Sequence, residues 1–166
     1  MENNSLLDVQ HLSHMFHLKR KMTVKAIDDV SFQIKKGEIY GLVGESGSGK
    51  STVARCIMNI YKPSEGEIFY KGIPICKSKE FRKNRKMLQM TRQMIFQDSA
   101  SSLNPRMKIE DIVAEPLRIY SGKGRPGKKE IEKQLELVGL DRSYMEKYPC
   151  ELSGGQRQRV AIARAL

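Results

Sequence analysis

Short apolar runs separated by turns dominate the chain up to about Tyr70 and predict strands. Residues 7–13 form the first run, and residues 66–70 form another that follows a turn. The run at 39–43 is almost wholly apolar, which is typical of a strand buried on both faces. Residues 93–97 are apolar at their centre, and we expect them to form a further strand.

Elsewhere the apolar positions recur at helical spacing. Residues 52–60 predict a helix that stops before Pro63, and residues 79–90 predict another. From about Ser99 the pattern is helical, and Pro116 is expected to kink or end the first helix there. The later helices are defined by Ile109, Ile112, Val113 and Leu117, and then by Ile131, Leu135 and Val138 before Gly139.

A glycine-rich octapeptide, Gly44–Ser51, lies between the expected strand at 39–43 and the helix that follows, and it matches G-x-x-x-x-G-K-[ST]. Its glycines let backbone N–H groups approach anionic oxygens, and the positive end of the helix dipole points toward the same place. The Lys50 ammonium would reach the β- and γ-phosphates, and the Ser51 hydroxyl suits Mg²⁺. The alternative is a Gly/Ser turn that happens to hold a lysine, and the flanking strand and helix argue against it. The residues expected to bind nucleotide are Gly44, Glu45, Ser46, Gly47, Ser48, Gly49, Lys50, Ser51 and Thr52.

A second glycine-containing motif lies near the C-terminus. Ser153 is expected to cap a helix, because an alanine-rich helical run begins directly after it. A helix start that contains two glycines is also an anion site. The residues of this motif are Leu152, Ser153, Gly154, Gly155 and Gln156.

The two motifs together closely resemble the phosphate-binding loop and the signature sequence of ATP-binding cassette (ABC) ATPases, and the resemblance covers almost the whole chain. It implies an α/β fold, a P-loop NTPase core with an N-terminal antiparallel β subdomain and an α-helical signature subdomain. The expected boundary separates residues 1–98 from residues 99–166. The resemblance also implies ATP and Mg²⁺ as cofactors. Two subunits would face each other head to tail, with residues 152–156 of one closing on the ATP of the other.

Two further residues gain roles only from this resemblance. Phe16 lies where the family has an aromatic residue that stacks on adenine, and the alternative is a half-buried aromatic at the end of a strand. Gln97 lies where a glutamine contacts Mg²⁺ or the attacking water and couples the site to the membrane partner. Taken alone, Gln97 would be an ordinary polar strand terminus. The metal ligands implied are Ser51 and Gln97.

Three segments, at 25–32, 43–52 and 102–106, resemble the ATPase subunits of bacterial oligopeptide, dipeptide and nickel importers, although Ser99 stands where relatives usually carry proline. The resemblance implies a subunit that couples ATP hydrolysis to uptake of peptides or nickel. Its partners would be a second ABC ATPase subunit, transmembrane permease subunits and, indirectly, an extracellular solute-binding protein. The alternatives are a soluble ABC ATPase of translation or DNA repair and a non-hydrolysing nucleotide-binding module.

The sequence ends at Leu166, inside the signature helix, and contains no apolar run closed by Asp-Glu. ABC ATPases require such a run, the Walker B strand, and then a D-loop and a switch histidine. His11, His14 and His17 all precede the phosphate loop and cannot serve as that histidine. We therefore expect a fragment truncated before the Walker B strand, which lacks a general base and binds nucleotide without hydrolysing it. Its sheet would have a gap or a bare edge, which lowers stability or recruits a second copy.

Composition fits a cytosolic, membrane-peripheral protein, and the resemblance implies the cytoplasmic face of a bacterial membrane. The net charge is +11, and no run of eighteen apolar residues or secretion signal occurs. The three cysteines form no zinc pattern, which indicates reduced thiols. The segment from Lys77 to Arg92 holds seven basic residues and one acid, and we interpret it as a solvated helix face. Because no aromatic residues alternate with these charges, no nucleic-acid partner is expected.

Overall fold

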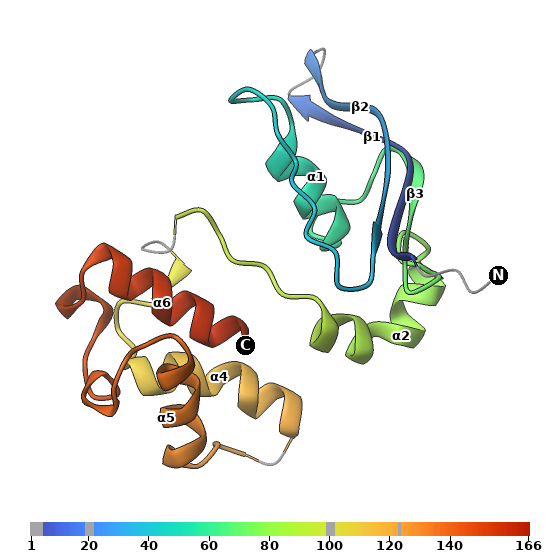
Figure 1. Cartoon of the computed structure of the whole chain (residues 1–166). Coiled ribbons are helices and arrows are strands. Elements are labelled where there is room, and N and C mark those ends of the chain that lie inside the picture. The colour runs from blue at the N-terminus through green and yellow to red at the C-terminus, as the bar shows by residue number, and fades with distance from the viewer. Residues whose placement is uncertain (1–4, 19–21, 99–101, 123) are drawn as a thin grey trace. The chain divides into compact units, whose positions relative to one another are not determined.

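The computed structural model describes residues 5–18, 22–98, 102–122 and 124–166 (Figure 1). The chain divides into two compact units, Met1–Arg92 and Gln93–Leu166, and each unit has its own hydrophobic core. The boundary expected between residues 98 and 99 stays a prediction. Ser99 lies outside the described residues.

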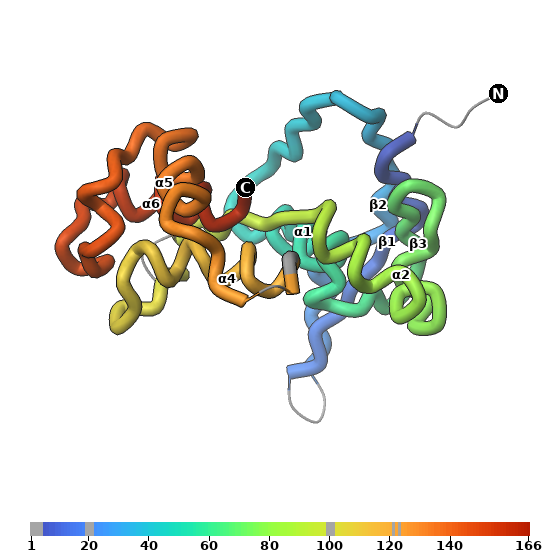
Figure 2. The backbone as a smooth tube through the Cα atoms, turned by 90° about the horizontal axis from the view of Figure 1, so that it is seen from below, coloured from blue at the N-terminus to red at the C-terminus, as the bar shows by residue number. Residues whose placement is uncertain are grey.

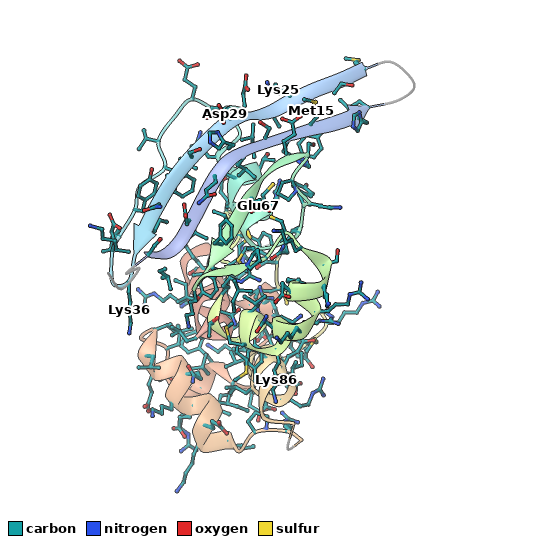
Figure 3. The ribbon with its side chains drawn as sticks, turned by 90° about the vertical axis from the view of Figure 1, so that its right-hand side faces the viewer. Met15, Lys25, Asp29, Lys36, Glu67 and Lys86 are labelled. Carbon is teal, nitrogen blue, oxygen red and sulfur yellow. The ribbon has the colours of Figure 1, made fainter. Side chains whose placement is uncertain are left out.

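The N-terminal unit is built on an antiparallel sheet of four strands in the order β2-β1-β3-β4. Strand β1 spans Ser5–Leu18 and β2 spans Met22–Lys35, and the two lie side by side along their length (Figure 3). The shorter strands are β3 (Glu65–Tyr70) and β4 (Ile73–Pro74). The predicted strands at 7–13 and 66–70 are therefore confirmed as parts of β1 and β3.

Two helices complete the core of this unit. Helix α1 spans Lys50–Ile57 and α2 spans Ser78–Thr91, which confirms both helices predicted in this half of the chain. Cys56 from α1 and Leu88 from α2 are fully buried together with strand residues such as Leu12 and Ile68. Helix α2 is fastened to the end of α1 by Arg92. Its Nη1 donates hydrogen bonds to the Ile57 carbonyl at 2.6 Å and to Asn59 Oδ1 at 3.0 Å.

The strands predicted at 39–43 and 93–97 are wrong for this structure. Neither segment is in a strand, and Ile39 and Val43 are 99% and 93% exposed. Figure 2 shows the chain after β2 as an open arc. The physical reason is that a strand forms only with a hydrogen-bonded neighbour, and the sheet within the described residues comprises only β1 to β4. Both runs are rich in apolar residues, but the described part of the chain supplies no ladder partner for them.

The open segment at 39–43 should exchange its amide hydrogens rapidly. No backbone hydrogen bond joins these residues to other described residues, whereas β1 is paired on both sides. We expect exchange within about tenfold of an unstructured peptide at 39–43, and strong protection at Val9 and Leu12. Hydrogen exchange measured by NMR or mass spectrometry tests this. Protection at 39–43 equal to that of β1 in a dilute monomer would contradict it. Protection that rises with protein concentration would indicate pairing with a second copy.

The C-terminal unit is helical. Its helices are α4 (Ile109–Ser121), α5 (Lys128–Leu137) and α6 (Gly154–Ala165), and two short 3-10 turns, η1 (Arg142–Tyr144) and η2 (Pro149–Glu151), connect the last two. Helices α4 and α5 are those predicted from apolar spacing, and α6 is the helix predicted from the Ser153 cap and the alanine-rich run after it. Their buried faces meet in one core whose fully enclosed members are Ile109, Val113, Ile131, Leu135 and Val160.

Helix boundaries in this unit follow local chemistry, with one correction. Helix α5 ends at Leu137, and Gly139 has a φ of 69°, as a glycine after a helix end commonly does. Pro116, by contrast, lies inside α4 and does not end it, so that part of the prediction is wrong. A proline in the second half of a helix removes a single hydrogen bond, and the buried Ile112 and Val113 keep the helix packed.

Two expectations from composition can be compared with the structure. Cys56, Cys76 and Cys150 are all free thiols, as predicted. Within the described ranges, every helix is too short or too polar to cross a bilayer.

Candidate functional site

The glycine-rich loop exposes residues 44–48 and leads directly into α1. The Lys50 ammonium folds back over the loop and donates hydrogen bonds to the Gly44 carbonyl at 2.8 Å, the Glu45 carbonyl at 2.6 Å and Ser48 Oγ at 3.2 Å. These acceptors are uncharged, and the first turn of α1 contains no acidic residue. Among the described residues no carboxylate pairs with Lys50, so its positive charge stays available to an anion.

Glycine conformation fixes where this loop lies. Gly49 caps α1 with a φ of 90°, and Gly47 has a φ of 83°. A Cβ at Gly49 would lie 2.2 Å from the carbonyl oxygen of Ala26 in β2, so the loop backbone approaches the strand as closely as only glycine allows. The exposed Ser51 side chain and the buried Thr52 follow in α1. An exposed hydroxyl beside a helix start is a donor set that suits a magnesium–phosphate complex.

The interior side of α1 carries no negative charge. Burial, together with the Cys76 thiol, raises the pKa of the Cys56 thiol to about 11. Cys56 is therefore a neutral thiol at pH 7, and it adds no charge that would oppose an anion at the start of the helix.

Phe16 lies near the end of β1, half-buried in a cluster of aromatic rings. Its ring is perpendicular to that of His14, with centroids 4.6 Å apart, and to that of Tyr61, with centroids 5.4 Å apart. His14 and Tyr61 are parallel to each other at 5.5 Å, and the Arg55 guanidinium lies 5.8 Å from the Tyr61 centroid. Two rings thus fix the orientation of Phe16 while neither lies parallel on its face. This arrangement is compatible with a stacking platform and with the alternative of a packed strand-end aromatic.

Gln97 lies in the other unit, in an extended segment outside regular structure, and its side chain is exposed. The expected strand that would have ended at Gln97 is absent, so the prediction of a role at the metal site rests on the family resemblance alone.

The signature motif forms a capped helix start, as predicted. Ser153 Oγ accepts a hydrogen bond from the Gln156 amide at 3.3 Å, and Gln156 Oε1 accepts one from the Ser153 amide at 2.9 Å. Leu152 is buried in the helical core, and Gln156 Nε2 donates to the Tyr144 hydroxyl at 2.9 Å. Ser153, Gly154 and Gly155 are exposed. Leu152 and Gln156 therefore anchor the motif, and the other three residues are exposed and can contact an anion.

Sequence reasoning missed the residues that support these motifs. Tyr61 and His14 orient Phe16, and Tyr144 holds Gln156. Tyr61 and Tyr144 act through contacts between different elements, which no local pattern identifies, whereas His14 lies two residues before Phe16 in β1. A single signal existed for Tyr61, an aromatic residue in the turn that follows a phosphate-loop helix.

Comparisons with known proteins agree with this geometry. A family model described as "ABC transporter" matches residues 27–166. The chain is 49% identical to the oligopeptide transport ATP-binding protein OppF of Bacillus subtilis, over 97% of the chain and 53% of that protein. It is 46% identical to OppF of Streptococcus mutans, over 97% of the chain and 52% of that protein. The chain thus spans about half the length of the curated relatives it matches.

A solved structure has the same fold. It is described as a dimeric post-hydrolysis state of the ATP-binding cassette MJ0796 bound to ADP and Pi. Its TM-score is 0.81 at 30% identity, with 96% of this chain and 68% of that chain covered. The likeness confirms the fold class expected from the sequence.

Proposed function

The chain belongs to the ABC transporter family, and on this premise we propose that it provides the ATP-binding part of an ATPase subunit in a peptide importer. The observation that carries the proposal is the loop at 44–51, where a lysine without a carboxylate partner meets a helix start. Both relatives are named as oligopeptide transport proteins, which favours peptides over nickel as the solute. They do not favour a soluble ATPase of translation or DNA repair.

In this proposal the residues of the N-terminal unit bind Mg²⁺–ATP. Backbone amides of the loop and the Lys50 ammonium hold the β- and γ-phosphates once the lysine exchanges its carbonyl acceptors for phosphate oxygens. The Ser51 hydroxyl binds Mg²⁺ in this proposal, and the family resemblance alone assigns Gln97, a residue of the other unit, to the same ion or to the attacking water. Phe16 stacks on the base, supported by His14 and Tyr61.

A second subunit completes the site. Ser153, Gly154 and Gly155 of the partner subunit would close on the γ-phosphate, so that a helix start and Lys50 clamp one triphosphate from two sides. The solved relative, described as dimeric and bound to ADP and Pi, supports this arrangement. Permease subunits at the cytoplasmic face of the membrane would be the further partners, with an extracellular solute-binding protein acting through them.

The polypeptide of this sequence should bind ATP without turning it over, because its residues include no apolar run closed by Asp-Glu that could supply a general base. Titration with Mg²⁺–ATP and Mg²⁺–AMP tests the binding. We expect ATP to bind and AMP, which lacks the β- and γ-phosphates, to bind far more weakly. Equal affinity for both nucleotides would overturn the proposed site. Phosphate release at the rate of a longer relative would overturn the lack of turnover.

Ser153 offers a separate test, because its capping role and its proposed phosphate role can be distinguished. Ser153→Ala removes the cap and should lower the free energy of unfolding by about 1 kcal/mol. Ser153→Asp keeps a capping oxygen, but it places a negative charge where the γ-phosphate should approach. We expect the Asp variant to keep its stability in urea denaturation and to lose ATP-dependent self-association in size-exclusion chromatography. Self-association of the Asp variant at the wild-type level would argue against a phosphate role.

A further inference from the structure

The N-terminal unit contains a cavity of about 330 Å³ that none of residues 44–51 lines. Two cationic side chains, Lys62 and Arg82, form part of its wall, and Tyr61 and Ser78 contribute hydroxyl groups. Phe81, which is partly exposed, supplies apolar surface to the lining. The cavity therefore combines positive charge, hydrogen-bond donors and an apolar surface in a space the size of a small ligand.

The positive charge of this cavity is not compensated by its own wall. No acidic residue lines it, and no ion pair to Lys62 or Arg82 occurs within the described ranges. Arg82 uses its Nε to donate to the Ser78 carbonyl at 3.3 Å, which leaves both terminal nitrogens for a ligand. The neighbouring carboxylate of Glu67, labelled in Figure 3, is paired with Lys77 at 3.0 Å.

Cys76 also lines the cavity, and its chemistry keeps the wall from gaining negative charge. Burial raises the pKa of the Cys76 thiol above its usual value. The thiol is therefore neutral at pH 7, and the net charge that a ligand meets comes from Lys62 and Arg82.

We propose that this cavity binds a small phosphate monoester that carries an apolar group. A phosphate monoester is close to a dianion at neutral pH, which matches two cations, and a guanidinium binds its oxygens in a bidentate manner. The two hydroxyls can donate to the remaining oxygens, and Phe81 can pack against the apolar group. The site shares none of the loop residues at 44–51, and Tyr61 is the lining residue that also contacts Phe16 of the proposed nucleotide site.

Cys76 gives this proposal a direct readout. We would measure the rate at which N-ethylmaleimide alkylates each cysteine, with phenyl phosphate as the probe and peptide mass spectrometry as the detector. Phenyl phosphate should slow alkylation of Cys76 and leave the exposed Cys150 unchanged, so that the chain carries its own reference. Phenol, which lacks the anion, should give no protection. Equal slowing at both cysteines, or none at Cys76, would overturn the proposal.

Variants that each remove one positive charge test which side chains the protection of Cys76 requires. Lys62→Gln and Arg82→Gln should each raise the phenyl phosphate concentration needed for protection by about tenfold or more, as expected for a lost charged hydrogen bond. Lys86→Gln removes the same charge from an exposed position on α2 that does not line the cavity, and it should have little effect (Figure 3). Lys50→Ala should also leave the protection intact, which separates this site from the phosphate loop. A loss with Lys86→Gln as large as with Arg82→Gln would refute a specific site.

The phosphate monoester has two possible sources, a soluble metabolite or a lipid headgroup, and a vesicle experiment distinguishes them. Vesicles of phosphatidylcholine with phosphatidic acid present the same monoester at a membrane surface. Sedimentation with these vesicles that requires Lys62 and Arg82 would assign the lipid headgroup. Protection by phenyl phosphate without such sedimentation would assign a soluble ligand. Both results support the site, whereas vesicle binding that Lys86→Gln abolishes equally would refute it in favour of general surface charge.

Discussion

Lys50→Ala should lower the affinity for Mg²⁺–ATP by about 10- to 100-fold, as expected for the loss of a charged hydrogen-bond donor to phosphate. In the structure the Lys50 ammonium has three acceptors, all of them uncharged groups of the loop itself. A triphosphate offers the same ammonium anionic oxygens, so exchanging acceptors strengthens each bond. Alanine removes this gain while keeping the start of α1 helical.

Isothermal titration at saturating magnesium measures the effect, with Lys36→Ala as the control. Lys36 is an exposed lysine at the end of β2, outside the loop, and its loss changes the net charge by the same amount (Figure 3). We expect the Lys36 variant to bind ATP almost as the parent does. Unchanged ATP affinity in the Lys50 variant would show that the loop does not bind the triphosphate in the proposed way.

Gly49→Ala should destabilise the N-terminal unit by about 3–5 kcal/mol, which places it among the most harmful single substitutions in a protein. Two costs combine at this position. A residue with a Cβ is strained at a φ of 90°, and the Cβ would lie 2.2 Å from the Ala26 carbonyl oxygen. Because the neighbour is backbone of β2, it cannot rotate away as a side chain would.

Gly47→Ala separates these two costs. Gly47 has a similar φ of 83°, but a Cβ there would meet nothing within 4 Å. We expect a loss of only about 1–2 kcal/mol, the cost of the backbone conformation alone. Urea denaturation followed by circular dichroism measures both variants. If the two substitutions cost the same, the close approach between the loop and β2 does not contribute to stability.

The features that the sequence predicted correctly depend on residues close together in the chain. The glycine loop and the Ser153 cap are set by neighbouring residues, so their positions in the fold follow from short motifs. The buried faces of α4 and α5 follow in the same way from apolar residues one turn apart, such as Ile131 and Leu135.

The features that the sequence did not predict depend on contacts between residues that are distant in sequence. The run at 39–43 has the composition of a buried strand, but strand formation requires a neighbour that the described residues do not supply. Tyr61 contacts a ring that is 45 residues away in sequence, and no periodicity encodes such a contact. The cavity beside Lys62 and Arg82 likewise arises where a turn and α2 meet.

The ring cluster around Phe16 bears on which nucleoside triphosphates the proposed site would bind. A phenyl ring has no polar atom, so a base stacked on it would be accepted for its flatness and not for its edge groups. Guanine is as flat as adenine. A site built in the proposed way would bind whichever purine triphosphate its surroundings hold in excess.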